Sequence, residues 1–160
     1  MDIWAHFQVH WESVFQIVMA IILGGMVGYE RERFKKGAGL RTNIMICLGS
    51  TIVTQVSIRM AQVHGGVGAD PGRIAAQIVS GIGFLGAGTI IQDRGRVHGL
   101  TTAASIWAVA GLGMAIGASF YWDALVATIG ILVTLMYLTK FRPHEVAQHK
   151  TEDDEQDQPE

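Results

Sequence analysis

Cysteine is almost absent from this 160-residue chain, which contains a single one, Cys47, inside an apolar segment. One cysteine excludes an intrachain disulfide and leaves the redox compartment open. We expect Cys47 to be a buried, inert thiol. The first residues also lack the positively charged start and the small-residue cleavage site of a signal peptide, so we expect the first apolar segment to be retained.

Charged side chains are missing from the interior of five long apolar runs. These runs cover approximately residues 14–29, 42–58, 74–91, 100–118 and 120–139. At a rise of ~1.5 Å per residue, helices of this length span about 24 to 30 Å, close to the hydrocarbon thickness of a bilayer. Each helix of a soluble bundle would carry a charged stripe, and none of these runs has one. The pattern predicts an all-α, polytopic membrane helix bundle with five transmembrane helices.

The basic residues predict how the bundle is oriented. Ten of the twelve Lys and Arg residues lie in the first connection, the third connection and the C-terminal end; the other two are Arg59 and Arg73. By the positive-inside rule the N-terminus lies outside and the C-terminus in the cytoplasm, as five crossings require. We therefore expect an outer segment (1–13), a transmembrane domain (14–139) and a cytoplasmic acidic tail (140–160) that is disordered.

Small residues recur at helical spacing in three of the runs. In lipid, helices associate through close backbone approach, which small residues permit. The three sets are Ala20, Gly24 and Gly28; Ala76, Ser80, Gly83 and Ala87; and Ala104, Ala108, Gly111 and Ala115. Each set predicts a face on which a neighbouring helix packs, with the third and fourth helices forming an antiparallel hairpin. The same faces could serve a homodimer.

The second run carries a polar stripe along nearly its whole length. Its members are Asn43, Cys47, Ser50, Thr54 and Ser57. Exposure of polar groups to acyl chains costs free energy, so the stripe should face the bundle interior or a wet cavity. Hydrogen bonding between helices is the interpretation we prefer, because no acidic residue lies midway along the stripe. Lining for an ion or small polar solute is the alternative.

Four glycines, Gly81, Gly83, Gly86 and Gly88, fall within eight residues of the third run. The first three satisfy the dinucleotide pattern GxGxxG, but that pattern requires a preceding strand and an acidic residue about twenty positions on, and both are missing. A straight helix with a glycine face explains the cluster best. A locally unwound helix that exposes backbone groups to a substrate is the alternative.

Charged residues at the predicted cytoplasmic face are the remaining candidates for a site. Glu30 directly follows the first apolar run, and Arg41 could provide the cationic partner that a buried carboxylate requires. Asp93 ends the third run on the same side, and a cation site would need it close to Glu30. On the other side, Asp70 and Pro71 predict a cap at the start of the third helix.

Catalytic and cofactor-binding patterns are missing from the sequence. His6, His10 and His64 lack metal-ligand spacing, and the chain has no Walker motif, no paired catalytic carboxylates and no nucleophile with an adjacent base. We expect no enzymatic activity, no cofactor and no nucleic-acid partner. Direct binding of a metal is left open.

Three segments resemble the MgtC/SapB family of bacterial inner-membrane proteins: GGMVGYERERFKKGAGLRTN (24–43), DPGRIAAQIVSGIGFLGAGTII (70–91) and GLTTAASIWAVAGLGMAIG (99–117). The resemblance covers about residues 14–139. Within the family, the chain resembles the shorter, SapB-like type without a C-terminal ACT-like domain. For MgtC-like members it implies roles in growth at low magnesium, macrophage survival and acid tolerance, through restraint of the F-type ATP synthase.

Adding the polar residues Asn43 and Asp93 to the positions that carry the family pattern defines our candidate functional residues. They are Glu30, Arg31, Glu32, Arg41, Thr42, Asn43, Gly81, Gly83, Gly86, Gly88, Asp93, Thr101, Thr102 and Trp107; Gly39 and Gly99 also belong to the pattern.

Three functions are compatible with these observations. The first is a non-enzymatic regulator of magnesium or energy homeostasis in the bacterial inner membrane, with a link to virulence, that contacts another membrane complex such as an ATPase or a transporter. The second is a transporter or channel for magnesium or another small solute. The third is a structural dimer whose charged loops recruit a soluble partner.

Overall fold

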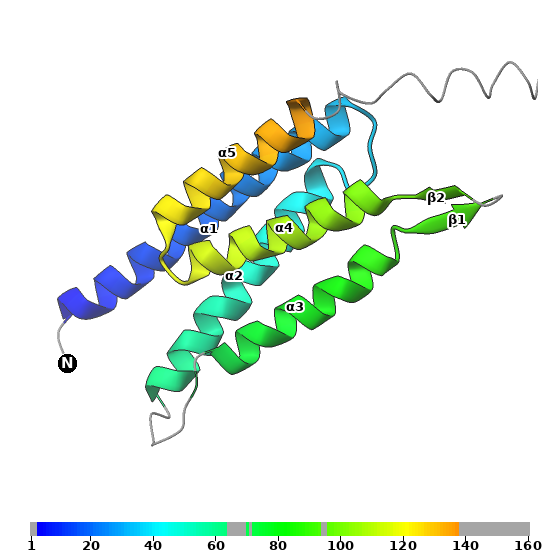
Figure 1. Ribbon diagram of the computed structural model, residues 1–160. Coiled ribbons are helices and arrows are strands. Elements are labelled where there is room, and N and C mark those ends of the chain that lie inside the picture. The colour runs from blue at the N-terminus through cyan, green and yellow to red at the C-terminus, as the bar shows by residue number, and fades with distance from the viewer. Residues whose placement is uncertain (1–2, 64–69, 71, 94–95, 138–160) are drawn as a thin grey trace, which may run out of the picture.

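The computed structural model describes residues 3–63, 70, 72–93 and 96–137. It contains five helices and one two-stranded hairpin (Figure 1): α1 (Ile3–Arg33), α2 (Leu40–Val63), α3 (Gly72–Ala87), β1 (Ile91–Asp93), β2 (Arg96–His98), α4 (Leu100–Gly117) and α5 (Tyr121–Tyr137). Each helix overlaps one apolar run, so the predicted all-α bundle is confirmed. The acidic tail, His64, Pro71 and Arg94 lie outside the described residues.

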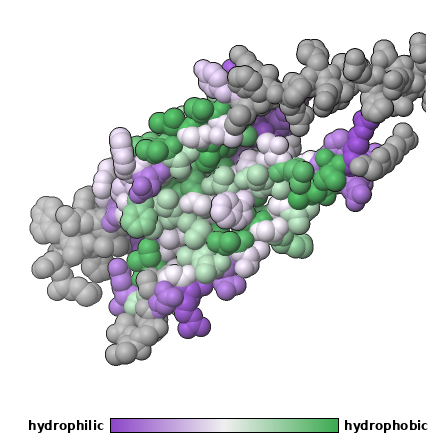
Figure 2. Space-filling model, in the orientation of Figure 1, coloured by the Kyte–Doolittle hydropathy of each residue, from purple (hydrophilic) through white to green (hydrophobic). Residues whose placement is uncertain are grey.

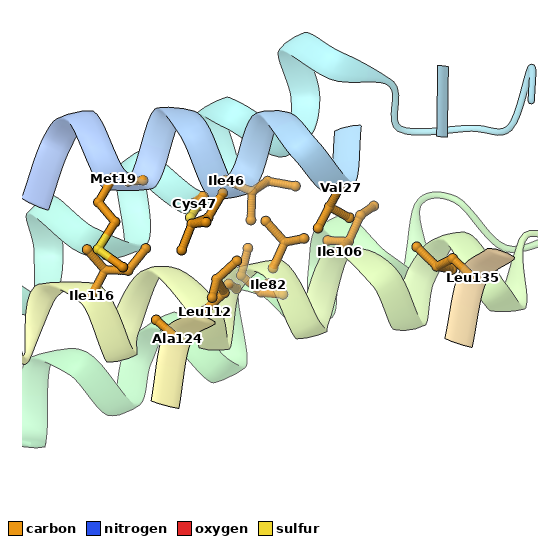
Figure 3. Packing of buried hydrophobic residues seen from close by; sticks show 14 residues of the cluster. Met19, Val27, Ile46, Cys47, Ile82, Ile106, Leu112, Ile116, Ala124 and Leu135 are labelled. Atoms are coloured by element: carbon orange, nitrogen blue, oxygen red, sulfur yellow. The ribbon is translucent and has the colours of Figure 1, made fainter. Parts of the chain in front are cut away.

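Helix α4 holds the bundle together, because it contacts each of the other four helices. Helix α2 packs against α1 on one side and α4 on another, and α3 lies along α2 and α4 (Figure 1). The core draws on all five helices, with Met19 from α1, Cys47 from α2, Ile82 from α3, Ile106 from α4 and Leu135 from α5 (Figure 3).

The outer surface of the bundle is apolar. Large side chains such as Ile22, Phe84, Trp107 and Ile129 are exposed, and apolar or neutral residues cover most of the face seen in Figure 2. Three stretches are long and apolar enough to cross a membrane: His10–Arg33, Leu40–Val63 and Leu100–Gly117. The apolar helices Ala75–Ala87 and Tyr121–Tyr137 are shorter. An apolar exterior of this kind is the expected surface for a helix bundle in lipid.

Glycines on α1 allow α2 to approach it closely. A Cβ atom at Gly24 would lie 2.7 Å from the Cβ of Cys47, and one at Gly28 would lie 2.7 Å from the Cα of Leu40. Together with the buried Ala20, these residues form the contact face predicted for the first helix. This face is confirmed, and any larger residue at Gly24 or Gly28 would push the two helices apart.

A second glycine pair, Gly113 and Gly117, lets α4 approach α2 closely. A Cβ atom at Gly113 would lie 2.3 Å from the carbonyl oxygen of Cys47, and one at Gly117 would lie 2.6 Å from that of Thr51. The hydroxyl of Thr51 donates to the carbonyl oxygen of Gly113 over 2.9 Å. Helix α2 therefore packs closely against two glycine pairs, one on α1 and one on α4, and in each pair the glycines are four residues apart.

The prediction that α3 and α4 pack against each other along their small-residue faces was wrong. Ala76, Ser80, Gly83 and Ala87 are exposed, and nothing lies within 4 Å of a Cβ atom built at Gly83 or Gly111. Helix α3 instead buries Ala75, Ile82 and Gly86 against the bundle. Helix α4 covers its large aliphatic residues Ile106, Leu112 and Ile116. The antiparallel contact of α3 with α4 is present, but through other residues.

The third apolar run ends in a hairpin where a longer helix and a polar loop were expected. Helix α3 stops at Ala87, where the N–H groups of Gly88 and Thr89 donate to the carbonyls of Phe84 and Gly86, and the β-branched Ile90 and Ile91 lead into β1. Strand β1 pairs antiparallel with β2, with Gln92 opposite Val97. Glycine and β-branched residues at the helix end explain this early stop.

The glycine cluster does not unwind α3. The helix runs unbroken from Gly72 to Ala87 through Gly81, Gly83 and Gly86. At its start the N–H of Gly72 donates to the side chain of Asp70 over 2.8 Å, so the predicted cap is confirmed. The straight-helix interpretation of this segment is therefore correct.

The two glycines of α4 provide a matched test of close packing. We expect Gly113→Ala to lower the stability of the protein in detergent by about 1–3 kcal/mol, because the added methyl group overlaps the backbone of α2. Gly111→Ala, two residues away in open space, should leave stability unchanged or raise it by up to about 1 kcal/mol. Thermal unfolding followed by circular dichroism measures both; an equal loss in the two variants would contradict this close packing.

Candidate functional site at the basic end of the bundle

Most of the charged candidate residues meet at one end of the bundle. The end of α1, the loop 34–39, the start of α2, the hairpin and the start of α4 all lie there, on the right of Figure 1. Five basic residues of α1, the loop and α2 gather at this end: Arg31, Arg33, Lys35, Lys36 and Arg41. The bundle thus has one strongly basic end.

Arg31 joins two segments that are 71 positions apart in the chain. Its side chain is 4% exposed, and Nη2 donates to the hydroxyl of Thr102 over 3.1 Å. Thr102 also lies against the loop, because a Cβ atom at Gly37 would be 3.3 Å from its methyl group. Two residues of the predicted site, from the first and third family segments, therefore form one buried contact.

Glu32 and Asn43 shape the turn between α1 and α2. The Glu32 carboxylate accepts a hydrogen bond from the N–H of Leu40 over 2.8 Å, which satisfies a free donor at the start of α2. The Asn43 amide donates to the carbonyl oxygens of Ala38 and Gly39. Ala38 has a positive φ of 55°, so this turn depends on side-chain hydrogen bonds to hold a backbone conformation that is rare outside glycine.

Glu30 is buried without the partner expected for it. Its side chain is 7% exposed and its Oε2 atom accepts no hydrogen bond. Arg41 is exposed and forms no ion pair with Glu30 within the described segments, so the expected partnership is wrong. The favourable charge beside Glu30 is that of the neighbouring Arg31. The Asn43 Oδ1 and Thr54 Oγ1 atoms are also buried acceptors without a hydrogen-bond partner.

The remaining candidates do not converge with Glu30. Thr42 and Trp107 are exposed, Gly81 and Gly83 face open space, and Gly86 packs against Ala103 of α4. Gly88 lies in the turn after α3. Asp93 sits on the exposed hairpin opposite Arg96, and Thr101 is exposed in the first turn of α4.

The polar stripe of α2 faces inward and is filled by packing. All of its members are buried, as predicted. Ser50 and Thr54 lie against Gly113 and Gly117, each with its Cβ atom 2.8 Å from the position of an added glycine Cβ. At Ser50 and Thr54 the stripe therefore packs against α4, and at Asn43 it packs against α1.

A polar network at the opposite end was missed by the sequence analysis. The Gln55 amide donates to the Gln16 side chain, whose own amide donates to Ser119 over 2.9 Å and to Tyr121 over 3.2 Å. The hydroxyls of Ser119 and Tyr121 in turn donate to Glu12. Two glutamines inside apolar runs were the available signal, since such residues need partners in lipid.

A cluster of metal ligands is not present in the part of the chain that the structure describes. No group of three or more His, Cys, Asp or Glu side chains there could hold a metal ion. Glu30, Asn43 and Thr54 each have one buried oxygen atom without a hydrogen-bond partner.

An apolar exterior, polar side chains hydrogen-bonded between helices and one basic end together define a helical membrane protein. The particular family follows from the sequence: residues 17–143 match the MgtC family, and the chain belongs to it.

Curated relatives share 41 to 46% identity with this chain. An uncharacterized protein of Haemophilus influenzae is 46% identical over 125 residues, 75% of this chain and 52% of its own length. The Escherichia coli K12 protein named "Putative magnesium transporter YhiD" is 41% identical, over 81% of this chain and 60% of its own. Protein MgtC of Salmonella typhimurium is 43% identical, over 74% and 49%.

The chain thus spans about half the length of the relatives it matches. No solved structure matches it.

The carboxylate cap at the α1–α2 turn can be tested by a pair of substitutions. We expect Glu32→Ala to lower stability by about 0.5–2 kcal/mol, the usual cost of a lost helix cap. Glu32→Gln keeps a side-chain oxygen that can accept the Leu40 N–H and should lose less than half as much. Thermal unfolding in detergent compares them, and equal losses would assign the effect to the charge of Glu32 rather than to the cap.

Proposed function

We propose that the chain is a non-enzymatic, multi-pass protein of the bacterial cytoplasmic membrane that regulates magnesium or energy homeostasis by contacting another membrane complex. The magnesium link is supported by the names of its relatives, which include one called a magnesium transporter. The single structural observation that carries the proposal is the small-residue face on α3, which no other helix of the bundle covers.

The uncovered face is built for a helical partner. Ala76, Ser80, Gly83 and Ala87 are exposed along one side of α3, with the 82% exposed ring of Phe84 beside them. Small residues that are not used inside the bundle leave room for a helix of another protein to approach within backbone contact. A membrane ATPase or a transporter would provide such a helix; a second copy of the chain is the competing occupant.

The proposed orientation places the basic end in the cytoplasm. Lys36 lies in the loop at this end, whereas Gln62 lies in the last turn of α2 at the other end. The anionic inner leaflet favours a cytoplasmic basic face. With five crossings, the N-terminus is outside and the C-terminus inside.

Cysteine labelling tests this orientation, because the only native cysteine is buried and can be replaced by alanine. In a Cys47→Ala background, we expect Lys36→Cys to react with a membrane-impermeant maleimide only after the cytoplasmic side is opened. Gln62→Cys should react in intact spheroplasts. The reverse pattern, or the same pattern at both positions, would contradict five crossings in this orientation.

Transport of magnesium or another small solute is the second candidate function. Three buried oxygen atoms without hydrogen-bond partners, on Glu30, Asn43 and Thr54, are the observation in its favour, since oxygen is the ligand that hard cations prefer. Against it stands the packing of Ser50 and Thr54 against the glycines of α4.

Photo-crosslinking in native membranes tests the regulator. A crosslinking amino acid at Ser80, on the uncovered face of α3, should give an adduct with a different membrane protein. One at Ile129, which is 61% exposed on α5, is the matched control and should not. Adducts of the chain with itself alone, together with unchanged cellular magnesium after deletion of the gene, would overturn the proposal.

Flux into liposomes that contain only the purified protein separates the two functions. A regulator should give no magnesium influx above empty liposomes. Influx that disappears in the Ser50→Ala, Thr54→Ala double variant, while the thermal unfolding temperature stays within a few degrees of the parent, would establish the transporter instead. A double variant with lower stability and no change in flux fits a packing role for the stripe.

A further inference from the structure

A pocket of about 520 Å³ opens at the basic end of the bundle. It lies between the end of α1, the loop 34–39, the junction of β2 with α4 and the last turn of α5. Its polar lining consists of Arg31, Lys36, His98, Thr101, Thr102 and Thr134. Among the described residues that line it, no carboxylate opposes the two cationic side chains.

The first turn of α4 contributes free backbone donors to this pocket. Gly99 precedes the helix with a φ of 88°, and no side chain caps the helix start. A Cβ atom at Gly99 would lie 1.8 Å from the carbonyl oxygen of Thr89, so glycine is required in this tight turn. The first N–H groups of a helix have no intrahelical acceptor, and the helix dipole adds a partial positive charge. The pocket therefore combines the backbone donors of the helix start with the cationic side chains of Arg31 and Lys36.

Arg31 gives independent evidence that the pocket binds a hydrogen-bond acceptor. Its guanidinium is almost fully buried, yet the Nε–H donor has no hydrogen-bond partner, and Nη2 uses one donor on Thr102. A buried cation with an unsatisfied donor is costly unless an acceptor completes its shell. Glu30 offsets part of the charge but does not line the pocket. Arg31 and the start of α4 line the same pocket.

We propose that this pocket binds a phosphate group that belongs to a larger molecule. An arginine fork, a lysine, hydroxyl groups and an uncapped helix start form the donor set that recognises phosphate oxygens in proteins. The volume exceeds that of a lone phosphate, and the apolar residues Val97, Leu100 and Leu135 line the rest of it. Either the headgroup of an anionic lipid or a soluble phosphate compound could present such a group.

Two neighbouring lysines give a matched test. Lys36 lines the pocket, whereas Lys35 is exposed on the same loop and does not line it. Lys36→Gln and Lys35→Gln remove the same charge from the same face. If the pocket binds phosphate, Lys36→Gln should weaken phosphate binding about tenfold, the effect of one lost charge-assisted hydrogen bond, and Lys35→Gln should not. General attraction to a basic surface predicts equal losses.

The measurement uses the full chain purified in a neutral, phosphate-free detergent. Three probes are compared by isothermal titration and thermal unfolding: inorganic phosphate, ATP without magnesium, and nanodiscs of phosphatidylcholine with or without phosphatidylglycerol. Stabilisation by phosphatidylglycerol alone identifies a lipid site, and binding of ATP or phosphate in detergent identifies a soluble ligand; either result supports the proposal if Lys36→Gln weakens it selectively. No binding of any probe, or equal losses in the two lysine variants, would overturn it.

Discussion

Close approach of α2 to both of its neighbours is the constraint on which the rest of this bundle depends. Gly24 and Gly28 of α1 and Gly113 and Gly117 of α4 have no side chain between the helices. At each of these glycines the backbone of α2 lies within contact distance. In lipid there is no hydrophobic drive to bring helices together, so dispersion contacts and hydrogen bonds at short range must hold them. The hydrogen bond from Thr51 to the Gly113 carbonyl forms only because the two backbones are this near.

This close approach explains where polar groups lie in the molecule. The middle of α2 packs against glycines, and the hydrogen-bonded side-chain networks lie at the two ends of the bundle. One end has the Gln16, Gln55 and Tyr121 network, and the other has the buried contact of Arg31 with Thr102. The two ends differ in charge, because Arg31 and four other basic residues gather at one of them. An apolar middle between two polar ends suits a bilayer and directs chemistry to the faces in contact with water.

The helices could be predicted from the sequence, and the contacts only in part. Five apolar runs marked five helices, and the contact face on α1 and the inward direction of the α2 stripe were also correct. The faces of α3 and α4 were not, because small residues occur on more than one side of each helix and spacing alone cannot say which side is covered. The hairpin was missed because Ile90 and Ile91 continue an apolar run that a helix would equally accept.

For the candidate site, the sequence marked candidate residues, and the tertiary structure decided which of them meet. Family motifs and the charge pattern marked Arg31 and Thr102 as separate positions, 71 residues apart, with no indication that one would donate to the other. Their contact, the unsatisfied Arg31 donor and the pocket beside it arise from the packing of α1 against α4, a relation between distant segments. Local sequence sets helix length and polarity, but the rotation of each helix about its axis is set by the fit of all five together.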